Sequence, residues 1–260
     1  MKIIISPAKQ MKTANDFMKA RSLPPLLDKT EQILARMREF DRAGLKELFR
    51  ANDRITEENY IRYQNMDLRN GLSPAVLTYQ GLAFSNMAPQ IFTKEQWEYV
   101  QKHLKILSGF YGILNAADGV VPYRLEMQTK LEVNGKQDLY EFWGEDIYRV
   151  LAEEIHEEAK QEKRSEDPAV ILNLASKEYS RAIAPYVEKD ISFVTCTFGE
   201  EVDGVIKVKG TFAKMARGQM CAWLAANQID TLEGVKKFQE SGYQYAEAYS
   251  SSKELVFLKS

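Results

Sequence analysis

The sequence lacks any hydrophobic run long enough to cross a membrane. Its 260 residues are 45% hydrophobic and 28% charged. No apolar stretch reaches the roughly 18–20 residues that a membrane span needs. The N-terminal MKIIISPAK contains an apolar stretch too short for a signal peptide. We therefore expect a cytoplasmic protein without membrane contact, folded around a large core.

Cysteine and histidine are also scarce. The two cysteines, Cys196 and Cys221, fit no metal-ligand spacing and suggest no disulfide framework. Neither His103 nor His156 has a further histidine, cysteine or carboxylate at a convincing ligand spacing. The sequence therefore predicts no metal site and no cofactor.

A strong net charge is missing as well. The formal net charge is −2 and the sequence pI is about 5.9. A chain with this balance has no general positive field to attract nucleic acid. Any affinity for nucleic acid has to come from a local cluster of basic side chains.

Short apolar runs alternate with amphipathic segments along the whole chain. Strands are predicted at residues 2–5, 75–81, 169–176, 191–198 and 205–212, and one or two more at 242–258. Helices are predicted at 26–40, 44–50, from 56, at 94–107, at 139–164 and from 213. The best candidate for a linker between two domains is Ser165–Pro168, but strands are expected on both sides of it. We therefore predict one mixed α/β domain over residues 1–260, with a mixed sheet and flanking helices.

Residues 94–131 hold a predicted helix followed by a glycine-bracketed turn. Thr93 and Gln96 form a capping-box signature, and the helix should end at Ser108. The turn consists of Gly109, Phe110, Tyr111 and Gly112, and glycine allows the positive φ that a tight turn requires. A helix–hairpin–helix uses such a turn to point backbone N–H groups at DNA phosphate. Taken alone, however, the pattern favours an ordinary corner between two helices, because a single glycine-rich turn is not specific.

Several blocks of the chain resemble the YaaA peroxide-stress protein family. They are LSGFYGIL with PYRLEM within 107–127, ISPAK within 4–9, LYEFWGEDI at 139–147, NLASKEY at 173–179, FAKMARGQM at 212–220 and a closing SGY…SSSKELVF. The chain has Asn115-Ala116-Ala117-Asp118 where that family usually reads Arg-Pro-Leu-Asp, so an arginine that could contact phosphate is missing. The resemblance implies a cytoplasmic protein that limits iron-driven damage under peroxide stress. It also implies a likeness to helix–hairpin–helix proteins that bind double-stranded or distorted DNA without reading its sequence.

Such a protein would bind DNA through a basic groove. The candidates for its lining, besides the turn 109–112, are Lys9, Arg124, Lys130, Lys207, Lys214 and Arg217. Lys214 and Arg217 are three residues apart and share a helix face. We expect them near the start of that helix, where cations oppose the dipole and a phosphate or the Glu126 carboxylate would offset the cost.

A rival interpretation is an enzyme that acts on a small anionic substrate such as a nucleotide. Its polar pocket would contain Ser6, Tyr79, Glu126, Asn173, Ser176, Glu178 and Tyr179. The sequence contains no recognisable catalytic triad or phosphate-binding P-loop, so it does not identify a reaction. A third interpretation is a scaffold for another protein. A long open groove would favour DNA, and a closed pocket with convergent polar groups would favour the enzyme.

Overall fold

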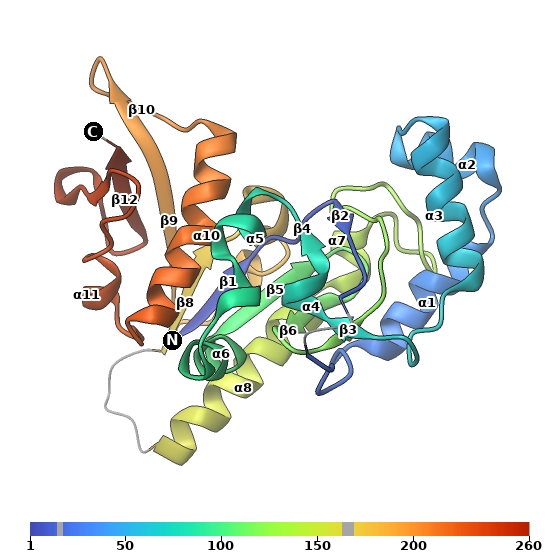
Figure 1. Cartoon of the computed structure of the whole chain (residues 1–260), viewed down its shortest axis with the longest axis horizontal. Helices are drawn as coiled ribbons and strands as arrows, with labels where there is room; N and C mark the ends of the chain where they lie inside the picture. Colours follow the sequence, from blue (N-terminus) through green and yellow to red (C-terminus); the bar gives the residue numbers. More distant parts are fainter. Residues whose placement is uncertain (15–17, 163–168, 260) are drawn as a thin grey trace.

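The computed structural model (Figure 1) describes residues 1–14, 18–162 and 169–259. The predicted break at Ser165–Pro168 lies outside these residues. The main strands are β1 (Lys2–Ile5), β5 (Leu104–Ser108), β6 (Gly112–Asn115), β8 (Ala169–Leu174), β9 (Ile191–Val202), β10 (Val205–Lys207), β11 (Tyr243–Tyr245) and β12 (Glu254–Lys259). They form an eight-stranded sheet in the order β11-β12-β9-β8-β1-β5-β6, with β10 paired to β9.

The strands β12, β9, β8, β1 and β5 run parallel, and antiparallel strands close the two edges. Chains of this kind bury both faces of the sheet under helices, so their central strands are apolar throughout. All four residues of β1 are buried. The mixed α/β fold predicted from the sequence is therefore confirmed.

Three helices cover opposite faces of the sheet. They are α6 (Lys94–His103), α8 (Asp146–Glu162) and α10 (Gly210–Ala226). Side chains alternate along a strand, so Lys2 and Ile5 point to opposite faces. Lys2 binds Glu154 of α8, at 2.5 Å between Nζ and Oε1, whereas Ile5 faces the α10 side, where it lines a cavity with Lys214. The helix α6 contacts both α10 and β1.

A group of helices packs beside the β6 edge of the sheet, far from β12 (Figure 1). It consists of α1 (Leu27–Arg38), α2 (Arg42–Phe49) and α3 (Asp53–Asn65). The short elements are β2 (Gln10–Met11), β3 (Ser73–Pro74), α4 (Ala75–Thr78), β4 (Tyr79–Gln80), α5 (Leu82–Met87), η1 (Pro89–Ile91), β7 (Gly119–Val120), α7 (Leu139–Trp143), α9 (Lys177–Ser180), η2 (Ala184–Tyr186), α11 (Leu232–Val235) and η3 (Glu247–Tyr249).

The expected helix–hairpin–helix is not formed. The helix that begins with the Thr93 capping box ends at His103, and residues 104–108 form β5. The turn at 109–112 therefore joins two antiparallel strands, β5 and β6. The prediction was wrong because β5 is buried on both faces, and an apolar run of that kind cannot be told from a helix by periodicity alone.

Three smaller predictions also need correction. Residues 75–81 form α4 and the short β4 instead of one strand. The single helix expected at 139–164 is divided into α7 and α8 at Gly144, which has a φ of +51°. The strand expected at 205–212 stops at Lys207, and α10 begins at Gly210.

Candidate anion-binding site

A cavity of about 340 Å³ lies at the carboxyl ends of β1 and β8. The chain leaves β1 for β5 on one side of it and returns later to β8 on the other side. The loops after β1 and β8 therefore lead in opposite directions and leave a crevice between them, which is where open α/β sheets bind their ligands. We call this space the cationic cavity.

The loops that follow the two strands are tied together by serine hydroxyls. The backbone N–H of Ser176 donates to Oγ of Ser6 at 2.8 Å, and the two hydroxyl oxygens are 3.2 Å apart. Asn173 shapes the β8 loop from below, because its Oδ1 accepts the N–H of Ala175 at 2.9 Å. These bonds fix the position of two hydroxyl groups at the edge of the cavity.

Four basic side chains line the cavity: Lys9, Arg124, Lys214 and Arg217. Two carboxylates, Glu126 and Glu178, offset half of this charge, so four positive and two negative groups leave a surplus of two positive charges. The Nε atoms of Arg124 and Arg217 are buried and have no hydrogen-bond partner in the described part of the chain. Burial lowers the pKa of the Arg217 guanidinium.

Glu126 joins two of these cations. Its Oε2 lies 2.8 Å from Nζ of Lys9, and its Oε1 lies 3.4 Å from a terminal nitrogen of Arg124. Arg124 and Glu126 therefore form an ion pair within one loop. The Lys9 side chain is 63% exposed, whereas that of Glu126 is only 19% exposed. Water screens the lysine, so this contact adds little stability and leaves the ammonium group available at the mouth of the cavity.

Glu178 is the second carboxyl group in the cavity. Burial, and then the nearby Glu126 charge, raise its pKa above the usual value. The backbone N–H of Gln128 donates to its Oε1 at 3.3 Å, which favours the ionised form and opposes this rise. A carboxyl group with a raised pKa holds its proton to a higher pH and can donate it in a hydrogen bond.

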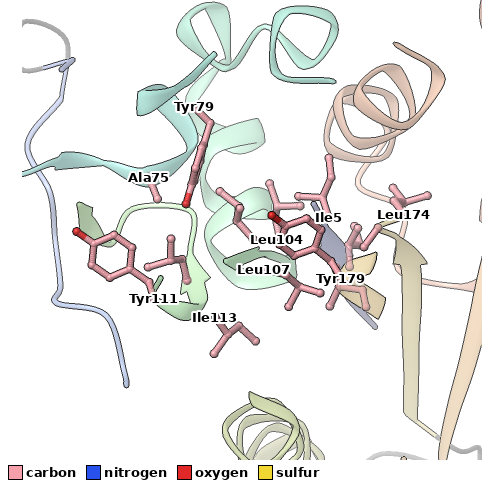
Figure 2. Close-up of a cluster of buried hydrophobic side chains, with 14 of the residues drawn as sticks. Ile5, Ala75, Tyr79, Leu104, Leu107, Tyr111, Ile113, Leu174 and Tyr179 are labelled. Carbon is pink, nitrogen blue, oxygen red and sulfur yellow. The ribbon is translucent and has the colours of Figure 1, made fainter. Parts of the chain in front are cut away.

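Aromatic and aliphatic side chains form the inner wall of the cavity. Figure 2 shows Tyr179 beside Ile5 and Leu174, which are the last residues of β1 and β8, and all three line the cavity. Tyr123 lies on the same wall, and burial raises its pKa to about 12. Its hydroxyl group lies 2.6 Å from Oγ of Ser108 and 2.9 Å from the Tyr79 hydroxyl. Tyr123 is therefore a neutral, firmly held side chain.

A close helix contact sets the opposite wall. A Cβ atom added at Gly218 of α10 would lie 1.9 Å from the carbonyl oxygen of Ala83 in α5. Glycine thus allows the two backbones to touch, and Lys214 and Arg217 reach the cavity beside Leu82 and Ala83. Any larger residue at position 218 would separate the two helices.

Residues 1–249 match the family described as peroxide stress protein YaaA. The chain belongs to this family. It is 44% identical over 259 residues to a UPF0246 protein of Desulfitobacterium hafniense strain Y51, covering 100% of this chain and 98% of the relative. A UPF0246 protein of Agathobacter rectalis is 43% identical over 257 residues, with 99% and 98% covered. One of Lachnoclostridium phytofermentans is 44% identical over 259 residues, with 100% and 96% covered. The resemblance is confirmed, and the family name supports a role in peroxide stress.

Most of the predicted site residues of this YaaA-family chain meet in the cationic cavity. They are Ser6, Lys9, Arg124, Glu126, Ser176, Glu178, Tyr179, Lys214 and Arg217. Residues predicted for two rival functions, the DNA groove and the polar pocket, thus share one space. Others lie elsewhere: Lys130 and Lys207 are exposed outside the cavity, and Tyr79 and Asn173 are buried behind it.

The turn at 109–112 does not present its N–H groups to a ligand. Phe110 and Tyr111 are 0% and 1% exposed, and their N–H groups donate to Oγ of Ser108 at 3.1 and 2.8 Å. A Cβ atom at Gly109 would lie 2.7 Å from the carbonyl oxygen of Leu125. The turn therefore supports the backbone between Arg124 and Glu126, and the expected direct contact of Gly109 and Gly112 with DNA is not what this geometry provides.

Two further expectations are corrected. Because α10 begins at Gly210, Lys214 and Arg217 lie beyond its first turn, and the helix dipole exerts little effect on them. Asn115, which stands where the family usually has arginine, donates to Asp118 at 3.3 Å. Asn115 does not line the cationic cavity, so this departure removes no cation from it.

Apart from Tyr179, the sequence did not predict the side chains that form the apolar wall and mouth. Tyr123 lies within the PYRLEM block, and Leu82 and Phe84 follow Gly81. No local pattern marks these residues, because they reach the cavity through pairing of distant segments. Within residues 1–14, 18–162 and 169–259, no three histidine, cysteine or acidic side chains gather where they could hold a metal ion. None of the helices described there is both long and apolar enough to cross a membrane.

Proposed function

We propose that this YaaA-family protein acts in peroxide stress by binding DNA through the cationic cavity, without reading its sequence. The observation that carries the proposal is the pair of buried Nε atoms of Arg124 and Arg217 that lack a partner in the described chain. A buried donor without an acceptor costs about 1–3 kcal/mol. A phosphate group in the cavity would supply acceptors to both guanidinium groups and would match their charge.

The position of the lysines favours a polyanion over a single small anion. Lys9 and Lys214 are both exposed at the cavity, and Lys214 forms no ion pair among the described residues. They would contact phosphates on either side of the one that the arginines hold. Phosphate contacts are the same for every sequence, so they position the protein without specifying bases. A cytoplasmic location remains part of this proposal.

The salt dependence of binding tests the proposal. Each neutralised phosphate contributes about −0.9 to the log–log slope of affinity against salt. Replacing Lys214 and Arg217 together by alanine should therefore flatten the slope by about two units and weaken binding to every duplex about equally. Binding is measured with fluorescent duplexes of two unrelated sequences, after circular dichroism has shown that the variant is folded.

A matched double variant controls for general loss of charge. Lys130 and Lys207 are exposed and do not line the cavity, so replacing both by alanine removes the same charge elsewhere. We expect it to leave the slope nearly unchanged. A cavity variant that keeps its affinity and slope would refute the proposal, and equal losses in both variants would assign DNA binding to a wider surface.

A second candidate is an enzyme acting on a small phosphate-bearing substrate. The observation in its favour is that Glu178, with its raised pKa, shares the cationic cavity with Glu126, which Lys9 and Arg124 hold. Two carboxyl groups in different environments suit an acid and a base, and the volume of about 340 Å³ suits a small ligand. Thermal unfolding in the presence of mononucleotides distinguishes this candidate from DNA binding. Stabilisation that Arg217→Ala abolishes, in a protein that binds no DNA, would put this candidate first.

A further inference from the structure

We infer that the cationic cavity receives a single unpaired nucleotide of the bound DNA, with its base against the aromatic wall and Leu82 in the space that it leaves. The inference rests on the proposed DNA binding and deepens it. It concerns the form of DNA that the site prefers, which the phosphate contacts alone do not determine.

The cavity combines the two surfaces that a nucleotide needs. The arginines and lysines supply partners for phosphate at one side, and the inner wall carries three largely buried aromatic rings, Phe84, Tyr123 and Tyr179. A phosphate by itself would need no apolar wall. Bases stack on aromatic side chains with little regard to sequence, so this wall fits a base attached to the phosphate that the cations bind.

A base within an intact duplex cannot reach this wall. The cavity holds about 340 Å³ and opens between the loops after β1 and β8, which is room for one nucleotide and not for a double helix. Proteins that bind a base in such a pocket take it out of the stack. Unstacking costs least where the base is already unpaired, so a bulged or mismatched site should bind better than a perfect duplex.

Leu82 occupies the position of a wedge. It is an apolar side chain, yet it is 42% exposed, and it lines the cavity next to the cations. Its backbone is held firmly, because Gly81 packs on Ala8 and Ala83 touches Gly218. Proteins that open or kink DNA insert leucine and similar side chains between base steps. An apolar side chain at the mouth can fill the gap that an extruded nucleotide leaves in the stack.

Three fluorescent duplexes of one sequence test the wild-type protein. The first is fully paired, the second carries a one-nucleotide bulge, and the third carries the same bulge without its base. We expect the bulge to bind about tenfold more tightly than the paired duplex, and loss of the base to remove most of that gain. Equal affinity for the first two overturns the inference. Equal affinity for the last two shows that no base enters the cavity, which also overturns it.

Variants locate the effect. Leu82→Ala should reduce the preference for the bulge about tenfold. Ile91→Ala is the matched control, because Ile91 is an apolar residue that is 77% exposed and does not line the cavity; it should keep the preference. A larger loss of the bulge preference in Ile91→Ala than in Leu82→Ala, or no loss in either variant, refutes the role of Leu82. A wild-type protein that binds paired DNA with the expected salt slope but shows no preference disproves this inference alone. A protein that binds none of the three disproves the proposed function as well.

Discussion

Replacing Gly218 by alanine should loosen the contact between α10 and α5. The added Cβ would lie 1.9 Å from the Ala83 carbonyl oxygen and 2.7 Å from its carbonyl carbon, and real Cβ atoms essentially never come closer than 3.0 Å. Both contacted atoms belong to the backbone, so no flexible side chain can move aside. The helices must separate by about 1 Å, and overpacking of this kind costs about 1–3 kcal/mol.

The substitution also brings a gain that has to be subtracted. Alanine is better than glycine inside a helix by about 1 kcal/mol. Because the clash is with backbone, we place the strain at the upper end of its range, about 3 kcal/mol, so the free energy of unfolding should fall by about 2 kcal/mol after the gain is subtracted. For a chain of this size, that lowers the thermal midpoint by about 4–8 °C. The proposed DNA binding should weaken too, because Lys214 and Arg217 would move away from Leu82 and Ala83.

Gly210→Ala is the control on the same helix. A Cβ atom at Gly210 would meet nothing within 4 Å, so this variant should be as stable as the parent or slightly more stable. Thermal and urea unfolding measure both variants. A Gly218→Ala protein as stable as its parent would show that the helices do not touch as described.

Two further predictions concern the turn and the buried carboxyl group. Gly112 has a φ of +73°, and a side chain there would press on Trp143 at 3.0 Å, so Gly112→Val should lower the free energy of unfolding by about 1–3 kcal/mol; an unchanged thermal midpoint would contradict this. The pKa of Glu178 is raised in the folded protein, so its contribution to stability is complete at low pH and is lost as pH rises through the folded pKa. Glu178→Gln should therefore be more stable than the parent at neutral pH and no more stable at acidic pH. Urea unfolding of both proteins from about pH 4 to 8 measures this difference. A parent protein that is the more stable of the two at neutral pH would disprove the prediction.

The sequence predicts the strands of the sheet best where they are short and rich in β-branched residues. Such runs predict the strands Lys2–Ile5 and Ala169–Leu174 correctly. Because the polar residues that follow parallel strands gather at one sheet edge, the sequence alone is enough to select Ser6 and Ser176 as residues that lie together at that edge. Their mutual hydrogen bond could not be predicted, since 170 residues separate them.

The sequence predicts poorly where a segment is buried on all sides. Leu104 and Leu107 continue the helical spacing of Trp97 and Val100, yet they belong to a strand. Burial on both faces removes the alternation that would have revealed it. The same error led to the predicted helix–hairpin–helix. The cavity and its wall residue Tyr123 could be recognised only from the pairing of distant segments.

The wall of the cationic cavity comes from segments spread across most of the chain, including residues 5–10, 80–84, 123–126, 174–179 and 214–217. No fragment that lacks one of them can form it, so a ligand of this cavity binds the complete fold and not the unfolded chain. Such a ligand present at a hundred times its dissociation constant would raise the free energy of unfolding by about 2.7 kcal/mol. The melting temperature of the protein is therefore a direct screen for what fills the cavity, and it requires no assumption about the chemistry that follows binding.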